Sequence, residues 1–109
     1  MTEGITGILV PVVTPLEQSG SPDISSLCRH VEWLLAHGVH GIWVNGTSGE
    51  FASFTSEERT LSVKAAVEQV RGRVPVIAHV GDAFTRQTAE HARAAREVGA
   101  DFIAVIAPF

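Results

Sequence analysis

A short apolar segment follows a glycine three times in this chain of 109 residues, and this repeat constrains the fold most strongly. The segments read GVHGIWV from Gly38, GRVPVIA from Gly72 and GADFIAV from Gly99. The glycines lie about 30 residues apart, which is the usual length of one strand and helix unit in parallel α/β proteins. Glycine commonly ends helices because it adopts the left-handed conformation without strain. The chain is therefore predicted to alternate helices and strands in units of similar length.

Three amphipathic stretches are predicted to be helices. Asp23 is a favourable N-cap for the first, and Thr55 and Glu58 have the spacing of a capping box at the start of the second. The predicted helices run from Asp23 to Gly38, from Thr55 to Gly72, and from Thr85 or Thr88 to Gly99. The predicted strands are Ile8 to Thr14, Gly41 to Val44, Val74 to Val80 and Phe102 to Ile106.

The predicted order is βαβαβαβ. Strands that are apolar along most of their length are typical of a parallel sheet that is covered on both faces. Eight such units close into a (β/α)8 TIM barrel of about 250 residues, so residues 1–109 are expected to be the amino-terminal part of a single TIM-barrel domain, here its first half. A flavodoxin-like sheet is the alternative. Four strands leave both sheet edges open, and a homo-oligomer is therefore expected.

Charge and composition exclude several classes of partner. The net charge is −4, and the eight Lys and Arg residues are scattered, which argues against a nucleic-acid partner. The apolar runs are too short to span a membrane, and residues 1–6 lack the features of a signal peptide. Cys28 is the one cysteine and is predicted to be buried, so a cytoplasmic location is expected. No cofactor motif and no set of metal ligands is found, and the spacing of His37 and His40 does not suit a metal.

The segment NGTSGE, residues 45–50, follows the second predicted strand. Ligands of parallel α/β proteins bind at the carboxyl ends of the strands. Gly46 and Gly49 allow the backbone to approach a ligand closely, so amide groups and the hydroxyls of Thr47 and Ser48 can converge on a small anion such as a carboxylate. The structural alternative is a glycine-rich turn in which Thr47 or Ser48 bonds its own backbone.

Other polar residues have two interpretations each. Glu50 either braces the loop by bonding its amides or acts as an acid-base group. His79, at the end of the third strand, either reaches the mouth of the site or is a packed histidine that satisfies a backbone carbonyl. His30 and His91 lie on predicted helices and are expected to be solvated.

Four segments together resemble the family that includes dihydrodipicolinate synthase and N-acetylneuraminate lyase. They are VPVVTPL, GIWVNGTSGEFASFTSEER, VPVIAHVG and GADFIAVIAPF. The Gly-Thr-Ser-Gly-Glu loop is the specific part of the resemblance, which covers the whole chain but only about the first third of such a protein. AHVG and the terminal PF are nearer to the lyase, whereas the order Thr47 then Ser48 is nearer to the synthase.

The resemblance implies a TIM-barrel lyase or aldolase that forms a Schiff base between a lysine and pyruvate or a related 2-oxo acid. It implies that Thr47, Ser48 and the amides at Gly46 and Gly49 bind the carboxylate, and that Thr47 also takes part in a catalytic proton relay. The chain contains no Tyr, and its one Lys, Lys64, is expected on a solvent-facing helix position. The 109-residue chain alone is therefore expected to be inactive. A catalytically silent half barrel that binds a carboxylate or pairs with another chain is the alternative.

Overall fold

The structure is a computed structural model that describes residues 4–107. It contains four strands and three α-helices in strict alternation, with one short 3-10 helix between β2 and α2. The elements are β1 (Leu9–Pro11), α1 (Ile24–Ala36), β2 (Gly41–Val44), η1 (Phe51–Ser53), α2 (Ser56–Val70), β3 (Val76–His79), α3 (Thr85–Glu97) and β4 (Phe102–Ala104).

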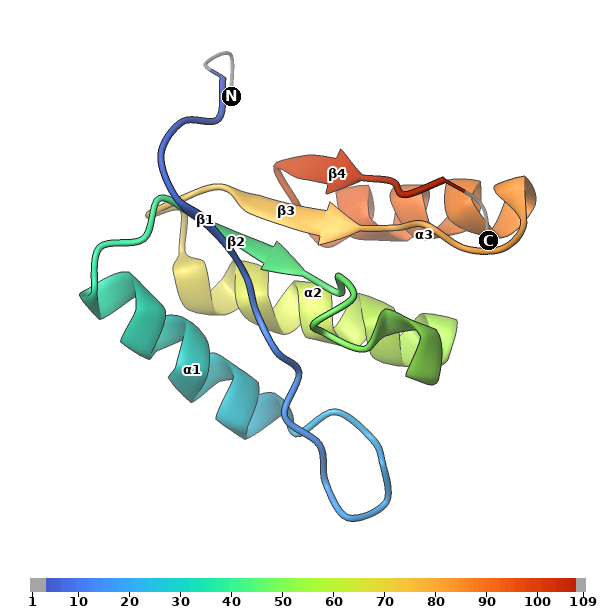
Figure 1. Cartoon of the computed structure of the whole chain (residues 1–109), viewed down its shortest axis with the longest axis horizontal. Helices are drawn as coiled ribbons and strands as arrows, with labels where there is room; N and C mark the ends of the chain where they lie inside the picture. Colours follow the sequence, from blue (N-terminus) through green and yellow to red (C-terminus); the bar gives the residue numbers. More distant parts are fainter. Residues whose placement is uncertain (1–3, 108–109) are drawn as a thin grey trace.

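The four strands form one parallel sheet in the order β1-β2-β3-β4. Each strand therefore pairs with the next one in sequence, and right-handed connections of this kind place all the crossover helices on one face. Figure 1 shows α1, α2 and α3 along the sheet in this order. This is the arrangement of half a TIM barrel, as predicted. The flavodoxin-like alternative is wrong, since its strand order reverses within the sheet and its helices cover both faces.

The helices begin and end close to the residues predicted from the sequence. The Thr55 side chain accepts a 3.1 Å hydrogen bond from the Glu58 amide, and the Glu58 carboxylate accepts a 3.0 Å bond from the Thr55 amide, which completes the predicted capping box. Gly38, Gly72 and Gly99 follow the three helices with φ of +80°, +74° and +99°. These left-handed conformations explain why glycine recurs after each helix.

Strand lengths agree less well, because β1, β3 and β4 are shorter than predicted. In β1 the ladder stops near Pro11, which has no amide hydrogen to donate. The Val12 amide still donates a 2.9 Å bond to Trp43 O, so the backbone stays beside β2 beyond the last paired residue. β1 and β4 lie at the open edges and are only partly buried, and Ile103 in β4 remains 49% exposed.

The main core lies between the sheet and the helices. Its strand residues alternate along each strand, as expected for side chains that point to one face. They pack against apolar residues from one stripe of each helix. The buried core residues are Val12, Leu27, Val31, Leu34, Ile42, Val44, Val63, Ala66, Val70, Val76, Ala78, Val80 and Ala95.

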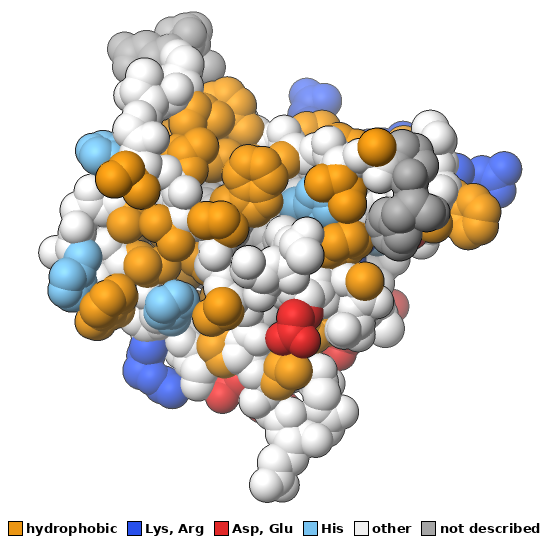
Figure 2. Space-filling view, viewed as in Figure 1, with side chains coloured by type: hydrophobic (Ala, Val, Ile, Leu, Met, Phe, Trp, Pro, Cys, Tyr) orange, Lys and Arg blue, Asp and Glu red, His pale blue; other side chains and the backbone are white. Residues whose placement is uncertain are grey.

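A second apolar row lies on the face of the sheet away from the helices. The strand register aligns Pro11, Trp43, Ile77 and Phe102 across all four strands. Ile77 in the middle is buried, whereas Pro11 at the edge is exposed. Figure 2 shows hydrophobic side chains gathered on this face of the molecule. The row corresponds to the interior of a barrel. No helix within residues 4–107 is long and apolar enough to cross a membrane.

Candidate active-site loop

The segment from Asn45 to Glu50 folds into a compact turn directly after β2. Asn45 and Glu50, at the two ends of the segment, have positive φ values of 63° and 59°, which residues other than glycine seldom adopt. Inside the turn, the Gly49 amide donates to Gly46 O and the Glu50 amide donates to Thr47 O, each at 3.0 Å. These bonds hold residues 46–50 in one conformation without help from a side chain of the turn.

Thr47 and Ser48 occupy the tip of this turn, and both are exposed. Neither hydroxyl makes a hydrogen bond to any of residues 4–107, and neither backbone amide donates one to them. The alternative in which these hydroxyls bond their own backbone is therefore absent from the described part of the chain. Two hydroxyls and two amides on adjacent residues remain available to a ligand.

Thr14 anchors the turn to the end of β1. Its side chain is 3% exposed, and its hydroxyl donates a 2.8 Å hydrogen bond to Gly49 O. A Cβ atom at Gly49 would lie 3.2 Å from both Thr14 Oγ1 and Val12 O, so a larger residue would press the turn away from this anchor. Thr14 belongs to the VTP segment at a strand end, but its role depends on a contact 35 residues along the chain, which sequence spacing does not reveal.

Glu50 does not brace the turn as expected. Its side chain is exposed and makes no capping hydrogen bond to η1. The amides of Gly49 and Glu50 donate to backbone carbonyls of the turn, so they are not available to the Glu50 carboxylate. For the same reason, the prediction that the Gly49 amide binds a ligand carboxylate is wrong for this conformation of the turn. Phe51, which follows, is 7% exposed and closes the turn against the interior.

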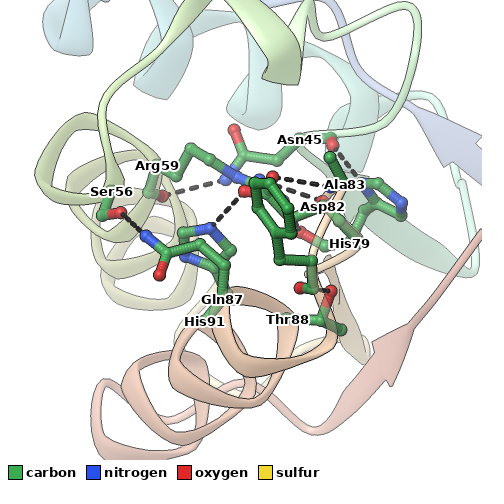
Figure 3. A network of polar contacts seen from close by, with 11 residues as sticks. Asn45, Ser56, Arg59, His79, Asp82, Ala83, Gln87, Thr88 and His91 are labelled. Carbon is green, nitrogen blue, oxygen red and sulfur yellow. Dashed lines mark hydrogen bonds and ion pairs between the residues drawn. The ribbon is translucent and has the colours of Figure 1, made fainter. Parts of the chain in front are cut away.

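His79 at the end of β3 is a packed histidine. It is 2% exposed, and its Nδ1 lies 2.9 Å from Asn45 O (Figure 3). Since a carbonyl oxygen can only accept, Nδ1 carries the proton and the neutral ring has its lone pair at Nε2. The ring also meets Phe51 edge to face, with centroids 4.6 Å apart. Burial lowers the pKa of His79, and nearby Arg59 and His91 act in the same direction.

Arg59 on α2 connects the turn with the end of β3 and is 4% exposed. Its Nη2 donates to His79 O at 3.0 Å and its Nη1 donates to Gly81 O at 3.1 Å. Asn45 Nδ2 donates to the backbone carbonyl oxygen of Arg59 at 2.9 Å. The guanidinium carbon lies 5.1 Å from the centre of the Phe51 ring, within the range of a cation–π contact. The buried charge therefore has partners on several sides (Figure 3).

Asp82 and His91 extend this network to α3. His91 Nε2 lies 2.9 Å from Asp82 Oδ2, and Arg59 Nη1 lies 3.6 Å from the same oxygen. The hydrogen bond with His91 holds the pKa of Asp82 below its ordinary value, and the charge of Arg59 adds to the effect. The prediction that His91 is solvated is wrong, because it is 6% exposed and turned toward Asp82. His30 is half-buried and stacks near Trp33, so it is not fully solvated either.

The chain is similar in sequence to known proteins. The sequence profile of the dihydrodipicolinate synthetase family matches residues 4–109. The chain belongs to this family. It is 44% identical over 106 residues to an uncharacterized DapA-like lyase of Halobacterium salinarum, an alignment that covers 97% of this chain and 35% of the relative. The chain therefore spans about a third of the length of the curated relatives that it matches.

Solved structures of the family have the same fold. Dihydrodipicolinate synthase of Acinetobacter baumannii in complex with pyruvate superposes with a TM-score of 0.93 at 35% identity, covering 97% of this chain and 36% of that one. N-acetylneuraminate lyase of Mycoplasma synoviae gives a TM-score of 0.89 at 30% identity, covering 96% and 37%. Both named branches of the resemblance are therefore among the structural neighbours, and the family assignment made from sequence is confirmed.

Other candidates in this family member lie away from the turn. Lys64 is exposed on α2, as predicted. Cys28 is half-buried rather than buried, with Sγ 3.9 Å from Ala65 O, and burial raises the pKa of its thiol. Within residues 4–107, no three His, Cys, Asp or Glu side chains are arranged to hold a metal ion.

Sequence reasoning missed Arg59 as a site residue and misplaced His91, although the pattern contained a signal for each. Arg59 precedes Val63 by one helical turn, on the stripe that continues through Ala66. His91 similarly precedes Ala95 by four residues. A polar residue on the apolar stripe of a helix points to the core and must find partners there.

Proposed function

We propose that the chain contributes the carboxylate-binding loop of a lyase or aldolase that acts on pyruvate or a related 2-oxo acid. The observation that carries the proposal is the pair of exposed hydroxyls, Thr47 and Ser48, at the carboxyl end of β2. These groups make no hydrogen bond within residues 4–107, and a fixed turn holds them side by side. Pyruvate in the complex of the Acinetobacter baumannii synthase supports the choice of a 2-oxo acid as ligand.

The chemistry suits a small carboxylate. A carboxylate has two oxygens and accepts several hydrogen bonds at once, and bonds to a charged acceptor are roughly twice as strong as neutral ones. The hydroxyls and amides of Thr47 and Ser48 are donors of the right kind. In this proposal Gly46 and Gly49 keep the backbone close to the ligand, and Thr47 additionally passes a proton during catalysis.

The covalent step of the proposed class I mechanism is formation of a Schiff base, which withdraws electrons from the neighbouring carbon of the oxo acid. This step needs a lysine that faces the carboxyl ends of the strands. Lys64, the one lysine, is exposed on α2 beside Thr60 and Leu61. We therefore expect that these 109 residues alone form no Schiff base. Trapping of pyruvate on the isolated chain by borohydride would contradict this expectation.

A pyruvate titration of the chain labelled with nitrogen-15 tests the carboxylate site. The amide signals of residues 46–49 should shift in a saturable way, while those of α1 stay in place. Acetone, which has the carbonyl but no carboxylate, should leave them unchanged. Constant signals of residues 46–49 at saturating pyruvate would refute the proposal.

Alanine variants test whether the hydroxyls of Thr47 and Ser48 contribute to pyruvate binding. Thr47→Ala and Ser48→Ala should each weaken pyruvate binding by roughly 1 to 3 kcal/mol, the range for a hydrogen bond to a charged group. Ser53→Ala is a matched control, because Ser53 is an exposed hydroxyl residue in the neighbouring η1. Equal weakening by the control would mean that the effect is not specific to the turn.

The open edges of the sheet suggest the assembly of the protein. We propose that the chain associates with copies of itself, because β1 and β4 present unpaired backbone groups and exposed apolar residues such as Ile103. We also propose a cytoplasmic location, because the single cysteine of the sequence, Cys28, cannot form a disulfide within the chain. Sedimentation of the purified chain as a monomer at all concentrations would contradict the association.

A further inference from the structure

We propose that Arg59 is a positioning residue that sets the geometry of the carboxylate-binding turn by clamping it to the end of β3. The inference rests on the proposed function, since it concerns the same turn. Arg59 lies outside the turn and touches it from α2, and none of its contacts is with Thr47 or Ser48.

The side chain is held at a defined place by its own helix. Arg59 lies one residue after Glu58, whose carboxylate completes the capping box, and its amide donates a 3.0 Å bond to Thr55 O. The capping box therefore sets the residue at which α2 begins. The guanidinium extends from this fixed point into a region where it is 4% exposed. Burial of a cation is unfavourable unless hydrogen bonds and an opposite charge compensate it, so the observed contacts are needed to keep it there.

Arg59 makes contact with both ends of the turn. At the start, Asn45 Nδ2 donates a 2.9 Å hydrogen bond to Arg59 O. At the end, the guanidinium lies over the ring of Phe51 at 5.1 Å. The residues between these two points are those that carry the exposed hydroxyls. A shift of Arg59 would therefore move the two ends of the turn relative to each other.

The same guanidinium holds the backbone that leaves β3. Its two terminal nitrogens donate to His79 O and Gly81 O, two carbonyls separated by one residue. The His79 side chain also connects the end of β3 to the turn, because its Nδ1 donates to Asn45 O at 2.9 Å. The turn after β2 and the segment after β3 are thus joined through two side chains, the guanidinium of Arg59, which lies over Phe51, and the ring of His79 (Figure 3). Both lie at the carboxyl ends of neighbouring strands, where the substrate is expected.

The geometry requires an arginine rather than any cation. Its planar fork presents separate nitrogens to the two carbonyls, whereas lysine has a single ammonium on a flexible stem. Lysine would keep the charge beside Asp82, but its single nitrogen cannot occupy the positions of both Nη1 and Nη2. Arg59→Lys therefore removes the paired bonds of the guanidinium to His79 O and Gly81 O, while it preserves the charge and the bond from Asn45 to the backbone carbonyl of residue 59. This separates positioning from electrostatic stability.

The first part of the test uses no ligand. In the Arg59→Lys variant, the amide signals of residues 45–51 and 79–82 should shift together and exchange with solvent faster, while those of α1 stay in place. Arg93→Lys, at an exposed arginine on α3, is the matched control and should change neither group of signals. Unchanged signals of residues 45–51 in Arg59→Lys would overturn the inference.

The second part measures pyruvate affinity at a temperature where each variant is fully folded. Arg59→Lys should bind pyruvate about tenfold more weakly, the effect of about 1.4 kcal/mol. A residue that only stabilises the fold would lower the unfolding temperature and leave this affinity unchanged, and that result would also overturn the inference. Absence of a pyruvate response in the unmodified chain would instead refute the proposed function, which the first part of the test does not use.

A second variant guards against misfolding of Arg59→Lys. Phe51→Leu keeps an apolar side chain at a buried position but removes the aromatic face beneath the guanidinium. It should shift the amides of residues 46–49 in the same direction as Arg59→Lys. A folded Phe51→Leu variant with unchanged signals there would count against the clamp.

Discussion

The Thr14 hydroxyl donates a 2.8 Å hydrogen bond to the carbonyl oxygen of Gly49, and this bond ties the end of β1 to the turn after β2. Thr14 is 3% exposed, so its partner cannot be replaced by bulk water without local opening. The bond therefore fixes one side of the turn, while the contacts of Arg59 fix its two ends.

Replacement of Thr14 by valine should destabilise the chain. Valine has nearly the same shape but leaves Gly49 O buried without this donor, at a cost of about 1 to 3 kcal/mol. Urea unfolding followed by circular dichroism measures the change. Thr6→Val is the control, because Thr6 is exposed. An equal stability of Thr14→Val and the unmodified chain would show that the bond contributes nothing.

Protonation of His79 should lower stability in mildly acidic solution. Burial depresses its pKa in the folded chain below the ordinary value of 6.5. Between these two values the unfolded chain binds a proton that the folded chain does not, so stability falls as the pH drops below 6.5 toward the folded pKa. Its contribution is present in full above 6.5.

The variant His79→Gln measures this contribution, since glutamine can donate to Asn45 O but does not titrate. Unfolding free energies of both proteins between pH 8 and pH 5 should converge as the pH falls. His37→Gln, at an exposed histidine, should follow the unmodified chain. Parallel curves for His79→Gln and the unmodified chain would contradict the prediction.

The ion pair between Glu32 and Arg73 should give a second, more acidic dependence. Arg73 Nη2 lies 2.8 Å from Glu32 Oε1, and Gln69 Nε2 donates to the same oxygen at 2.7 Å. These bonds, that of Arg73 first, lower the pKa of Glu32 to about 2 from its ordinary 4.5. The contribution is therefore present above pH 4.5 and is lost as the pH falls toward 2.

Thermal unfolding at pH 5 and pH 3 tests the role of this pair. The Glu32→Gln variant should lose less stability between the two values than the unmodified chain. Glu17→Gln is a suitable control, because Glu17 is exposed and has no ion pair within residues 4–107. High salt should narrow the difference, since both partners are partly exposed.

The sequence predicted the fold better than the site because the two depend on different distances along the chain. The helices and the strand order follow from local signals such as the capping box at Thr55 and the glycine after each helix. The anchor of Gly49 depends instead on Thr14, and the clamp depends on two carbonyls at and just after the end of β3, which lie 20 and 22 residues from Arg59. No local pattern specifies such pairs. The buried positions of Arg59 and His91 could have been inferred from their helical stripes, but not the identity of their partners.

A glycine near the start of β1 provides a final test of the packing at the other end of the sheet. Gly7 has φ of +87°, which L-residues with side chains rarely adopt, and a Cβ there would overlap the ring of His40. That ring accepts a 2.9 Å hydrogen bond from the Ile8 amide through Nδ1. Gly7→Ala should therefore cost both backbone strain and this bond.

Gly20 separates the two effects. It has a similar φ of +93°, but nothing lies within 4 Å of the position of its Cβ. Gly20→Ala should therefore cost only the strain of a left-handed residue, about 1 kcal/mol. Gly7→Ala should lower the unfolding free energy by more than Gly20→Ala, because the displaced ring of His40 leaves the Ile8 amide without its acceptor. Equal losses in the two variants would mean that His40 moves aside at no cost.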